Sequence, residues 1–530
     1  MQRIYKFLQD NTTLNNTLKA SVFKPDSNTI SFSYPAPQRG DLASVRFIRT
    51  VVPGDITGSA PLLNGPAQPV DVYQMIYYSS NSDNNSSVEL VSGTLCIPST
   101  ITKSKVILFG RGAALATDDA NTSSWQYMDG SSSIWTTKTP TTRNTAVRAL
   151  GNVISSGIGY VHLFPDGFGV GVSLNKTSLF TNYFSFINPQ VDMLRAFKKY
   201  LEYTKSIRSN LFQNRFTGQQ LEFIYTGYSE GAMTGAGVAN EFMPGVSQSI
   251  PQSEAILFKP VKLILGANLQ SKPYFDYLYT NRATAATRYI NNTIIHLIMS
   301  VISGNYNVQG FASDNAIANI LPAYESDLNR TLSETLLGTN PNFNTTYSKI
   351  IYDYTVNSAA LISAGVQAPY LDTNTGVFYA DWKQLMRENG ILYLSQLIDN
   401  NLPSVSRLRS LVDLSNVPIT NIYSQQDELI RPVNGVDQAE SIHQSSNFGP
   451  DVIGTGYKFP GANKSLSYYT ITGGSIPSES SMIGGILTQP NNSYVTYMVD
   501  ATAYTTALNS HGGFGIVYAK YLELILAQLN

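Results

Sequence analysis

From about residue 105 onward, short apolar runs alternate with longer stretches in which apolar residues recur every three or four positions. Apolar runs bounded by Gly, Pro or Asn and rich in β-branched and aromatic residues are typical of strands buried on both faces of a sheet. The longer stretches have the period of amphipathic helices. This alternation predicts βαβ units and a mostly parallel central sheet flanked by helices, so the expected fold class is α/β. The predicted strands are 105–110, 158–164, 221–227, 261–268, 417–424 and 493–501, and the predicted helices include 189–207, 231–243 and 515–529.

The chain before this region has a different pattern. Two β-like runs, 71–80 and 87–98, are separated by a turn rich in Asn and Ser, which predicts a pair of antiparallel strands. The residues ahead of them mix short β-like runs with a Pro- and Gly-rich stretch at 53–69. We therefore expect residues 1–70 to form an N-terminal extension, followed by a core that begins near residue 71.

A long central segment interrupts the alternation of strands and helices. Residues 269–414 contain several helical patterns and no strong pair of strands. A structureless loop of that length is implausible in a compact domain, so we expect an inserted helical cap. The core then comprises residues 71–268 and 415–530. Because the insertion follows a predicted strand, it should lie over the carboxyl edge of the sheet, where ligands of α/β proteins bind.

The charge balance does not indicate a polyanionic partner. The 530 residues include 35 basic and 36 acidic ones, a net charge of −1, so no nucleic-acid partner is expected. No apolar run is long enough to predict a transmembrane segment. Cys96, the single cysteine, lies in an apolar run and should be a small core residue. The neutral, hydroxyl-rich composition favours a secreted or periplasmic protein, although the first residues do not resemble a signal peptide.

The strongest local motif is the G-x-S-x-G pentapeptide Gly227-Tyr228-Ser229-Glu230-Gly231. Gly and Ser are common in this chain, so the motif gains its weight from following an apolar β-run and preceding a helix of small residues. On such a tight turn, side chains two positions either side of the serine would collide with the backbone, which explains the two glycines. Ser229 is therefore the predicted nucleophile.

A serine hydroxyl needs a base to take its proton, and the chain has four histidines that could do so. His162 and His296 lie within apolar runs, and His443 follows a helical run expected to be solvated, so structural roles are favoured for these three. His511 lies instead in the Gly-rich sequence NSHGGFG, between the last predicted strand and the terminal helix. A loop there can present the imidazole at the carboxyl edge of the sheet, which makes His511 the predicted general base.

The third member of such a triad is a carboxylate that orients the histidine. Asp427 comes at the end of the predicted strand 417–424 and precedes a Pro-containing turn, so it is the preferred candidate. Glu428 and Asp437 are its competitors. A side chain at 428 would point away if that of Asp427 points in, and Asp437 falls within the following helix.

Two backbone N–H donors should stabilise the oxyanion that forms in acyl transfer. Glu230, directly after the nucleophile, is expected to supply one of them. The loop after strand 105–110 should supply the other, from Arg111, Gly112 or Ala113. The side chain of Arg111 has two further interpretations, as a ligand for a substrate carboxylate or as a surface arginine.

The sequence LFPDGFGVGVS at 163–173 is rich in glycine. Its glycine spacing does not match a dinucleotide-binding loop, and it predicts a strand-ending turn beside the active site. With the Ser229 motif, the inserted segment, Asp427 and His511, this P-D-x-x-G-x-G pattern resembles the α/β-hydrolases, and within them the secretory lipases and large bacterial carboxylesterases.

The resemblance covers roughly residue 72 to the end and implies an α/β-hydrolase fold with the triad in the order Ser, Asp, His. Arg111 departs from the His-Gly found at its position in many relatives. The implied activity is hydrolysis of carboxylic esters, small or polymeric, through an acyl-enzyme, without a metal or organic cofactor. Two alternatives stay open because fold analogy does not fix the substrate. They are a serine peptidase or amidase with the same triad, and a non-catalytic binding protein on the same scaffold.

Overall fold

A computed structural model of the chain describes residues 27–54, 65–80, 88–111, 153, 156–168, 170–173, 183–207, 210–243, 250–267, 417–424, 463–470, 480–491, 493–500 and 511–529. The predicted cap at 269–414 lies outside these residues, and so do Gly112, Asp427 and His443. His511 is described by its backbone alone.

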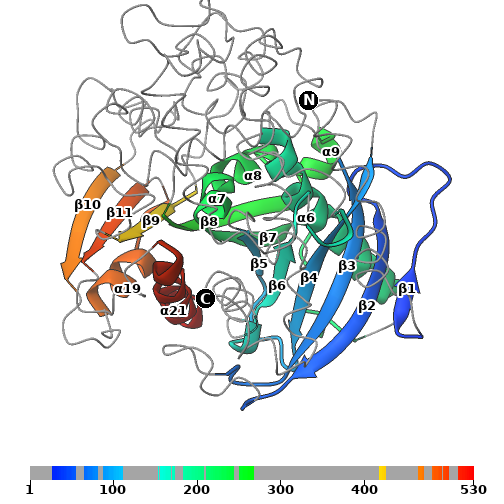
Figure 1. Ribbon diagram of the computed structural model, residues 1–530, viewed down its shortest axis with the longest axis horizontal. Helices are drawn as coiled ribbons and strands as arrows, with labels where there is room; N and C mark the ends of the chain where they lie inside the picture. The colour runs from blue at the N-terminus through cyan, green and yellow to red at the C-terminus, as the bar shows by residue number, and fades with distance from the viewer. Residues whose placement is uncertain are drawn as a thin grey trace, which may run out of the picture.

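One sheet of eleven strands runs through the described residues, in the order β1-β2-β3-β4-β6-β5-β7-β8-β9-β11-β10 (Figure 1). Its first part is antiparallel throughout. The predicted antiparallel pair is confirmed, because β3 and β4 pair from one end to the other. β1 and β2 continue this sheet into the segment predicted as an N-terminal extension, and the boundary at residue 70 stays a prediction. The four strands are β1 (Thr29–Ser31), β2 (Leu42–Val51), β3 (Val70–Ser79) and β4 (Glu89–Pro98).

The second part of the sheet is parallel and contains all six strands predicted from apolar runs, which confirms the α/β fold class. β6 joins the two parts, because it pairs antiparallel with β4 and parallel with β5. The prediction missed β10, whose sequence NKSLSYYT has too few consecutive apolar residues to stand out. The strands are β5 (Val106–Gly110), β6 (Val161–Pro165), β7 (Leu221–Tyr228), β8 (Phe258–Gly266), β9 (Ile419–Ser424), β10 (Asn463–Thr470) and β11 (Ser493–Asp500).

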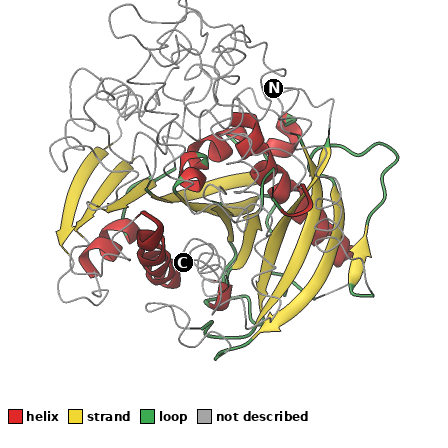
Figure 2. Ribbon diagram, in the orientation of Figure 1, coloured by secondary structure: helices red, strands yellow, loops and turns green. Residues whose placement is uncertain are grey.

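Helices pack on the sheet and connect its parallel strands (Figure 2). The predicted helix 231–243 is divided at Thr234 into α7 and α8. Pro189, expected at the start of a helix, lies inside one that begins six residues earlier. None of the described helices has the length and apolar character needed to cross a membrane. The helices are η2 (Gly171–Ser173), α6 (Tyr183–Ser206), α7 (Glu230–Met233), α8 (Gly235–Glu241), α9 (Gln252–Ala255), α19 (Ser480–Leu487) and α21 (His511–Gln528).

Two tyrosines of β7 show which helices lie on which face of the sheet. Side chains alternate along a strand, so Tyr225 and Tyr228 point to opposite faces. The hydroxyl of Tyr225 reaches Gln190 of α6, whereas the ring of Tyr228 lies 5.5 Å from that of Tyr518 in α21. Figure 1 agrees, with α6 and α8 on one side of the sheet and α19 and α21 together on the other. The central strands are thus covered on both faces, as their apolar sequences predicted.

The single cysteine lies in the apolar core, as the sequence predicted. Cys96 of β4 is fully buried opposite Val72 of β3, in an apolar cluster that also includes Ile76, and burial raises the pKa of its thiol to about 12. A thiol with so high a pKa is a poor nucleophile, which fits the predicted role as a small core residue.

Candidate active site

Ser229 occupies a sharp turn between β7 and α7. Its φ of 57° and ψ of −127° place a residue with a side chain in a backbone conformation that such residues rarely adopt and that carries strain. Backbone hydrogen bonds hold the turn on both sides. The N–H of Ser229 donates to the carbonyl of Gly266 at 2.8 Å, and the N–H of Ala232 donates to the carbonyl of Ser229 at 2.9 Å. The turn has the strand-to-helix geometry of a nucleophile elbow.

Glycines are required at three positions around this turn. A Cβ atom at Gly227 would lie 2.5 Å from the carbonyl oxygen of Gly231, and one at Gly231 would overlap the carbonyl of Gly110. A Cβ atom at Gly110 would overlap the hydroxyl of Tyr225. The end of β5 therefore packs backbone against backbone on the turn that carries Ser229. The collision predicted for larger residues in the motif is confirmed, and the loop after β5 begins directly beside the turn.

A buried network of neutral polar groups holds the residues that follow Ser229 in place. The hydroxyl of Tyr225 lies 2.5 Å from the carbonyl oxygen of Gly231, 2.6 Å from the hydroxyl of Thr234 and 2.7 Å from Oε1 of Gln190. Nε2 of Gln190 donates to the Thr234 hydroxyl at 2.8 Å. Burial raises the pKa of Tyr225, so its hydroxyl keeps its proton and can donate. This network links the first turn of α7 to β7 and α6 through hydrogen bonds alone.

Three ionisable residues lie beside the turn. Oδ2 of Asp166 accepts a hydrogen bond from the hydroxyl of Ser92 at 2.5 Å, and its Oδ1 lies 3.8 Å from Nη1 of Arg111. Burial raises the pKa of Glu230 well above its usual range, and nearby Arg111 offsets part of that rise. The side chain of Arg111 is only 8% exposed, so the interpretation as a surface arginine is wrong. Asp166 belongs to the Gly-rich segment that was predicted to pack beside the active site, and its contact with Arg111 agrees with that placement.

The helix that begins at His511 runs antiparallel to the parallel strands. Its residue Tyr518 contacts the carboxyl-terminal ends of β7 and β8, where its hydroxyl accepts from the N–H of Gly227 and donates to the carbonyl of Ile264. Beyond the other end of α21, the carbonyl of Leu529 accepts from groups that precede β5 and β6 in the chain. The backbone of His511, seven residues before Tyr518, is therefore displaced from Tyr518 toward the carboxyl edge of the sheet, where Ser229 also lies.

His511 was expected in a loop, but it is the first residue of α21. The helix begins four residues ahead of its predicted start. The difference has a simple cause. Gly512 and Gly513 disfavour the interior of a helix, but in the first turn their cost is smaller because that turn has few backbone hydrogen bonds to lose. A base at this helix start remains compatible with the predicted role.

His162 is fully buried in β6, and burial lowers the pKa of its imidazole to about 3. The structural role predicted for it is therefore confirmed. Asp427 and Gly112 lie outside the described residues, but β9 and β5, which lead to them, run parallel to β7 and β8. Among the described residues, no group of three or more His, Cys, Asp or Glu side chains could hold a metal ion.

The structure thus brings Ser229, Glu230 and Arg111 together and places the backbone of His511 at the same edge of the sheet. Sequence reasoning did not identify the supporting residues Tyr225, Gln190, Thr234 and Tyr518. They carry no local motif, since each acts through a partner that is distant in the sequence.

No protein-family model matches the chain, and no curated protein matches it. Among solved structures, it is similar to a ligand-bound form of the rice cell wall degrading esterase LipA from Xanthomonas oryzae, with 14% sequence identity and a TM-score of 0.48. That match covers 93% of this chain and 99% of the esterase. It is also similar to lipase A from Candida antarctica, with 14% identity and a TM-score of 0.41 over 74% of this chain and 71% of the lipase. The mixed sheet and the strained serine turn of this chain are those of an α/β-hydrolase fold.

Proposed function

We propose that this chain is a serine hydrolase that cleaves carboxylic esters through an acyl-enzyme intermediate. The observation that carries the proposal is the strained conformation of Ser229, at the end of a central strand. Backbone strain of this kind persists only where the surrounding structure enforces it, and it is concentrated at functional sites. Here Gly110, Gly227 and Gly231 remove the side chains that would prevent the turn. A serine on such a turn lies at the carboxyl edge of the sheet, where its hydroxyl can attack a substrate.

In the proposed mechanism, Oγ of Ser229 attacks the ester carbonyl while His511 takes its proton. Asp427 orients the imidazole and stabilises its protonated form. His511 then donates that proton to the leaving alcohol, which departs as the acyl-enzyme forms. A water molecule, activated by His511 in its turn, attacks the acyl-enzyme and releases the acid.

The oxyanion would be stabilised by the N–H of Glu230 and by one N–H from residues 111–113. Two features of the surroundings support this assignment. The N–H groups of the first turn of a helix have no acceptor within the helix, and Glu230 is the first residue of α7. Burial raises the pKa of the Glu230 carboxyl group well above its usual range, which favours the neutral form and so weakens repulsion of the negative charge that develops on the substrate.

The choice of esters rests on the sequence pattern rather than on a described acyl pocket. The P-D-x-x-G-x-G segment, the Ser229 motif and the order of the candidate triad resemble those of secretory lipases and large bacterial carboxylesterases. Arg111 contacts Asp166 and acts electrostatically on Glu230, so the loop after β5 carries a side chain engaged with the protein rather than one committed to a substrate carboxylate. A serine peptidase would use the same triad with a different pocket.

We also propose export of the protein, as its neutral composition favours.

The test is hydrolysis of p-nitrophenyl esters from acetate to palmitate by the wild type and by Ser229→Ala. Removal of the nucleophile should lower kcat by about 10⁴-fold or more. The chain length that is cleaved fastest would measure the size of the acyl pocket.

A matched control is Ser156→Ala, which removes another buried serine hydroxyl, one that donates to the carbonyl of Tyr160 at 2.9 Å. It should retain wild-type kcat. Cleavage of a peptide anilide with no cleavage of esters would favour the peptidase. Absence of turnover by the wild type on both substrate classes would favour the non-catalytic binding protein.

A further inference from the structure

Tyr518 connects the terminal helix to the strand that leads to Ser229. Its hydroxyl donates to the carbonyl of Ile264 in β8 at 2.7 Å and accepts from the N–H of Gly227 in β7 at 3.3 Å. Both backbone groups are near the carboxyl-terminal ends of their strands, and Gly227 is two residues before Ser229. One side chain of α21 is therefore bonded to the two strands beside the candidate nucleophile.

The ring of Tyr518 is as closely fitted as its hydroxyl. It lies 5.5 Å from the ring of Tyr228, the residue directly before Ser229. A Cβ atom at Gly266 would lie 2.6 Å from Cδ2 of Tyr518, so only a glycine leaves room for the ring at that position. Burial raises the pKa of Tyr518, which keeps the hydroxyl protonated and able to donate. The side chain is fixed against both backbone and ring, and it cannot shift without moving the helix.

The geometry of a helix relates Tyr518 to the start of α21. Residues seven positions apart are separated by about two turns, lie on the same face and are about 10 Å apart along the axis. Position 511 therefore shares the face of α21 that packs on β7 and β8, and it is displaced from Tyr518 toward the carboxyl edge of the sheet. A translation or rotation of α21 would move position 511 relative to Ser229 by a similar amount.

We propose that Tyr518 is a positioning residue, which sets the separation between the nucleophile Ser229 and the base His511 by bonding α21 to β7 and β8. The proposal rests on the proposed function, because it needs those two residues in those roles. A misplacement of about 1 Å between reacting groups lowers a rate by about 100-fold, so a shift of a few tenths of an ångström is enough to matter.

The opposite end of α21 supplies a matched control. The hydroxyl of Tyr160 donates to the carbonyl of Leu529, directly after the helix, at 2.9 Å. Tyr160→Phe and Tyr518→Phe therefore each remove one tyrosine hydroxyl that ties α21 to the body of the protein, and both retain the ring. They differ in the end of the helix that is released, near the amino edge of the sheet or near Ser229.

The experiment compares wild type, Tyr518→Phe and Tyr160→Phe, each purified as a folded monodisperse species and assayed well below its melting temperature. Two readouts are measured: kcat and KM for the best p-nitrophenyl ester, and the rate at which a fluorophosphonate probe labels the active-site serine. Labelling needs an activated serine but does not need an ester substrate. We expect Tyr518→Phe to lower kcat and the labelling rate by about 10-fold, with KM unchanged, and Tyr160→Phe to lower neither.

Each other outcome overturns the proposal in a recognisable way. If both variants lose activity equally, or if Tyr518→Phe is labelled as fast as the wild type, the positioning role is wrong and the hydrolase stands. If only KM rises in Tyr518→Phe, the residue acts on substrate binding and the positioning role is again wrong. If Ser229 of the wild type is not labelled at all, the proposed function fails and the positioning role fails with it.

Discussion

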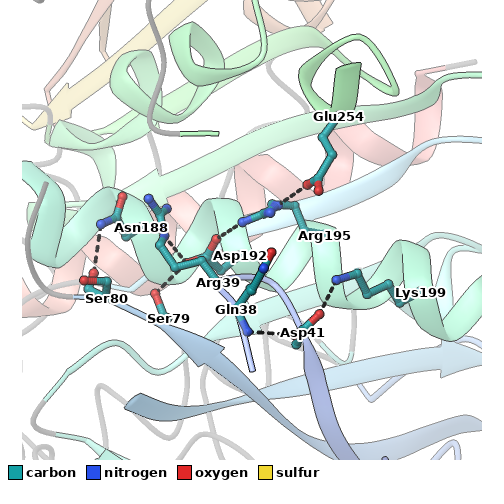
Figure 3. Close-up of polar contacts among 10 residues, drawn as sticks. All are labelled: Gln38, Arg39, Asp41, Ser79, Ser80, Asn188, Asp192, Arg195, Lys199 and Glu254. Carbon is teal, nitrogen blue, oxygen red and sulfur yellow. Dashed lines mark hydrogen bonds and ion pairs between the residues drawn. The ribbon is translucent and has the colours of Figure 1, made fainter. Parts of the chain in front are cut away.

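Helix α6 takes part in two buried polar networks of opposite character. Toward its amino end, Gln190 joins Tyr225 and Thr234 in the neutral network beneath Ser229. Beginning two residues later, Asp192, Arg195 and Lys199 form ion pairs (Figure 3). Neutral hydrogen bonds of this helix thus support the candidate active site, and ion pairs from its following residues bind it to other parts of the protein.

The ion pairs are centred on Asp192, whose carboxylate is fully buried. Oδ2 of Asp192 accepts from Nε of Arg39 at 2.9 Å and from the hydroxyl of Ser79 at 2.7 Å, and Oδ1 accepts from Nη1 of Arg195 at 2.8 Å. Nε of Arg195 donates to Oε2 of Glu254 in α9 at 2.5 Å. The charged network therefore ties the segment before β2, the end of β3 and α9 to one helix.

The difference has consequences for how each region responds to change. A buried charge that loses its partner carries a large desolvation cost, whereas a neutral hydroxyl that loses one costs less. The charged network should therefore determine whether the chain stays folded. The neutral network should determine how accurately the turn at Ser229 is held.

The largest expected effect is on stability and comes from Asp192→Asn. The amide has nearly the shape of the carboxylate but leaves Arg39 and Arg195 without their shared negative partner. Loss of one member of a buried ion pair costs about 3–5 kcal/mol, so we expect the free energy of unfolding to fall by that amount in urea titrations. Hydrolysis per folded molecule should stay at the wild-type value.

The matched control for Asp192 is an exposed ion pair on the same helix. Lys198 and Glu202 are 3.3 Å apart, and the Glu202 side chain is 62% exposed. Glu202→Gln should change the free energy of unfolding by less than about 0.5 kcal/mol. A cost for Asp192→Asn as small as that of the control would contradict the assigned role of the charged network.

A smaller effect, on activity, should follow from Gly231→Ala. The added Cβ atom overlaps the carbonyl of Gly110, so the turn and the loop after β5 must move apart. A displacement of about 1 Å should lower kcat/KM for the best p-nitrophenyl ester by about 100-fold. Wild-type activity in a folded variant would show that the packing of these two segments is not needed for catalysis.

Gly484→Ala controls for the change from glycine to alanine. Gly484 lies within α19, and no atom would lie within 4 Å of an added Cβ. Because alanine favours a helix over glycine, the variant should be more stable by about 0.5–1 kcal/mol in the same urea titrations. Its kcat/KM should equal that of the wild type.

The sequence predicted the parts of this fold that have a local signature. Apolar runs located six of the seven parallel strands, and the G-x-S-x-G pattern located the strained turn at Ser229, because the collisions that require Gly227 and Gly231 occur within a few residues. The sequence did not predict β10, which has few apolar residues, or the extension of α6 ahead of Pro189. Contacts such as those of Tyr518 and Asp192 depend on partners more than a hundred residues away, so no local pattern reports them.

Lys262 of β8 offers a third test of the comparison between charged and neutral networks, because its buried charge has a neutral partner. Its Nζ donates to the carbonyl of Ile486 in the last turn of α19 at 2.5 Å. Within the described residues, no carboxylate forms an ion pair with it. Burial lowers the pKa of its amine to about 8, from an ordinary value of 10.5. The folded protein therefore releases this proton at a lower pH than the unfolded chain does.

Stability should consequently rise with pH in the range between these two pKa values, because there the unfolded chain binds more protons than the folded protein. Between pH 8 and pH 10.5 the contribution of Lys262 amounts to about 2–3 kcal/mol. We expect Lys262→Met to remove this rise, measured as the difference from wild type in the free energy of unfolding at each pH. Lys259→Met, which removes a half-exposed positive charge from the same strand, controls for the change in net charge. If the two variants show the same dependence on pH, then α19 and the surrounding side chains do not isolate the amine from water. The desolvation cost assigned to a buried charge without an ionic partner would then be absent at Lys262. The evidence for a difference between the charged and the neutral network of α6 would in that case come only from the buried arginines paired with Asp192.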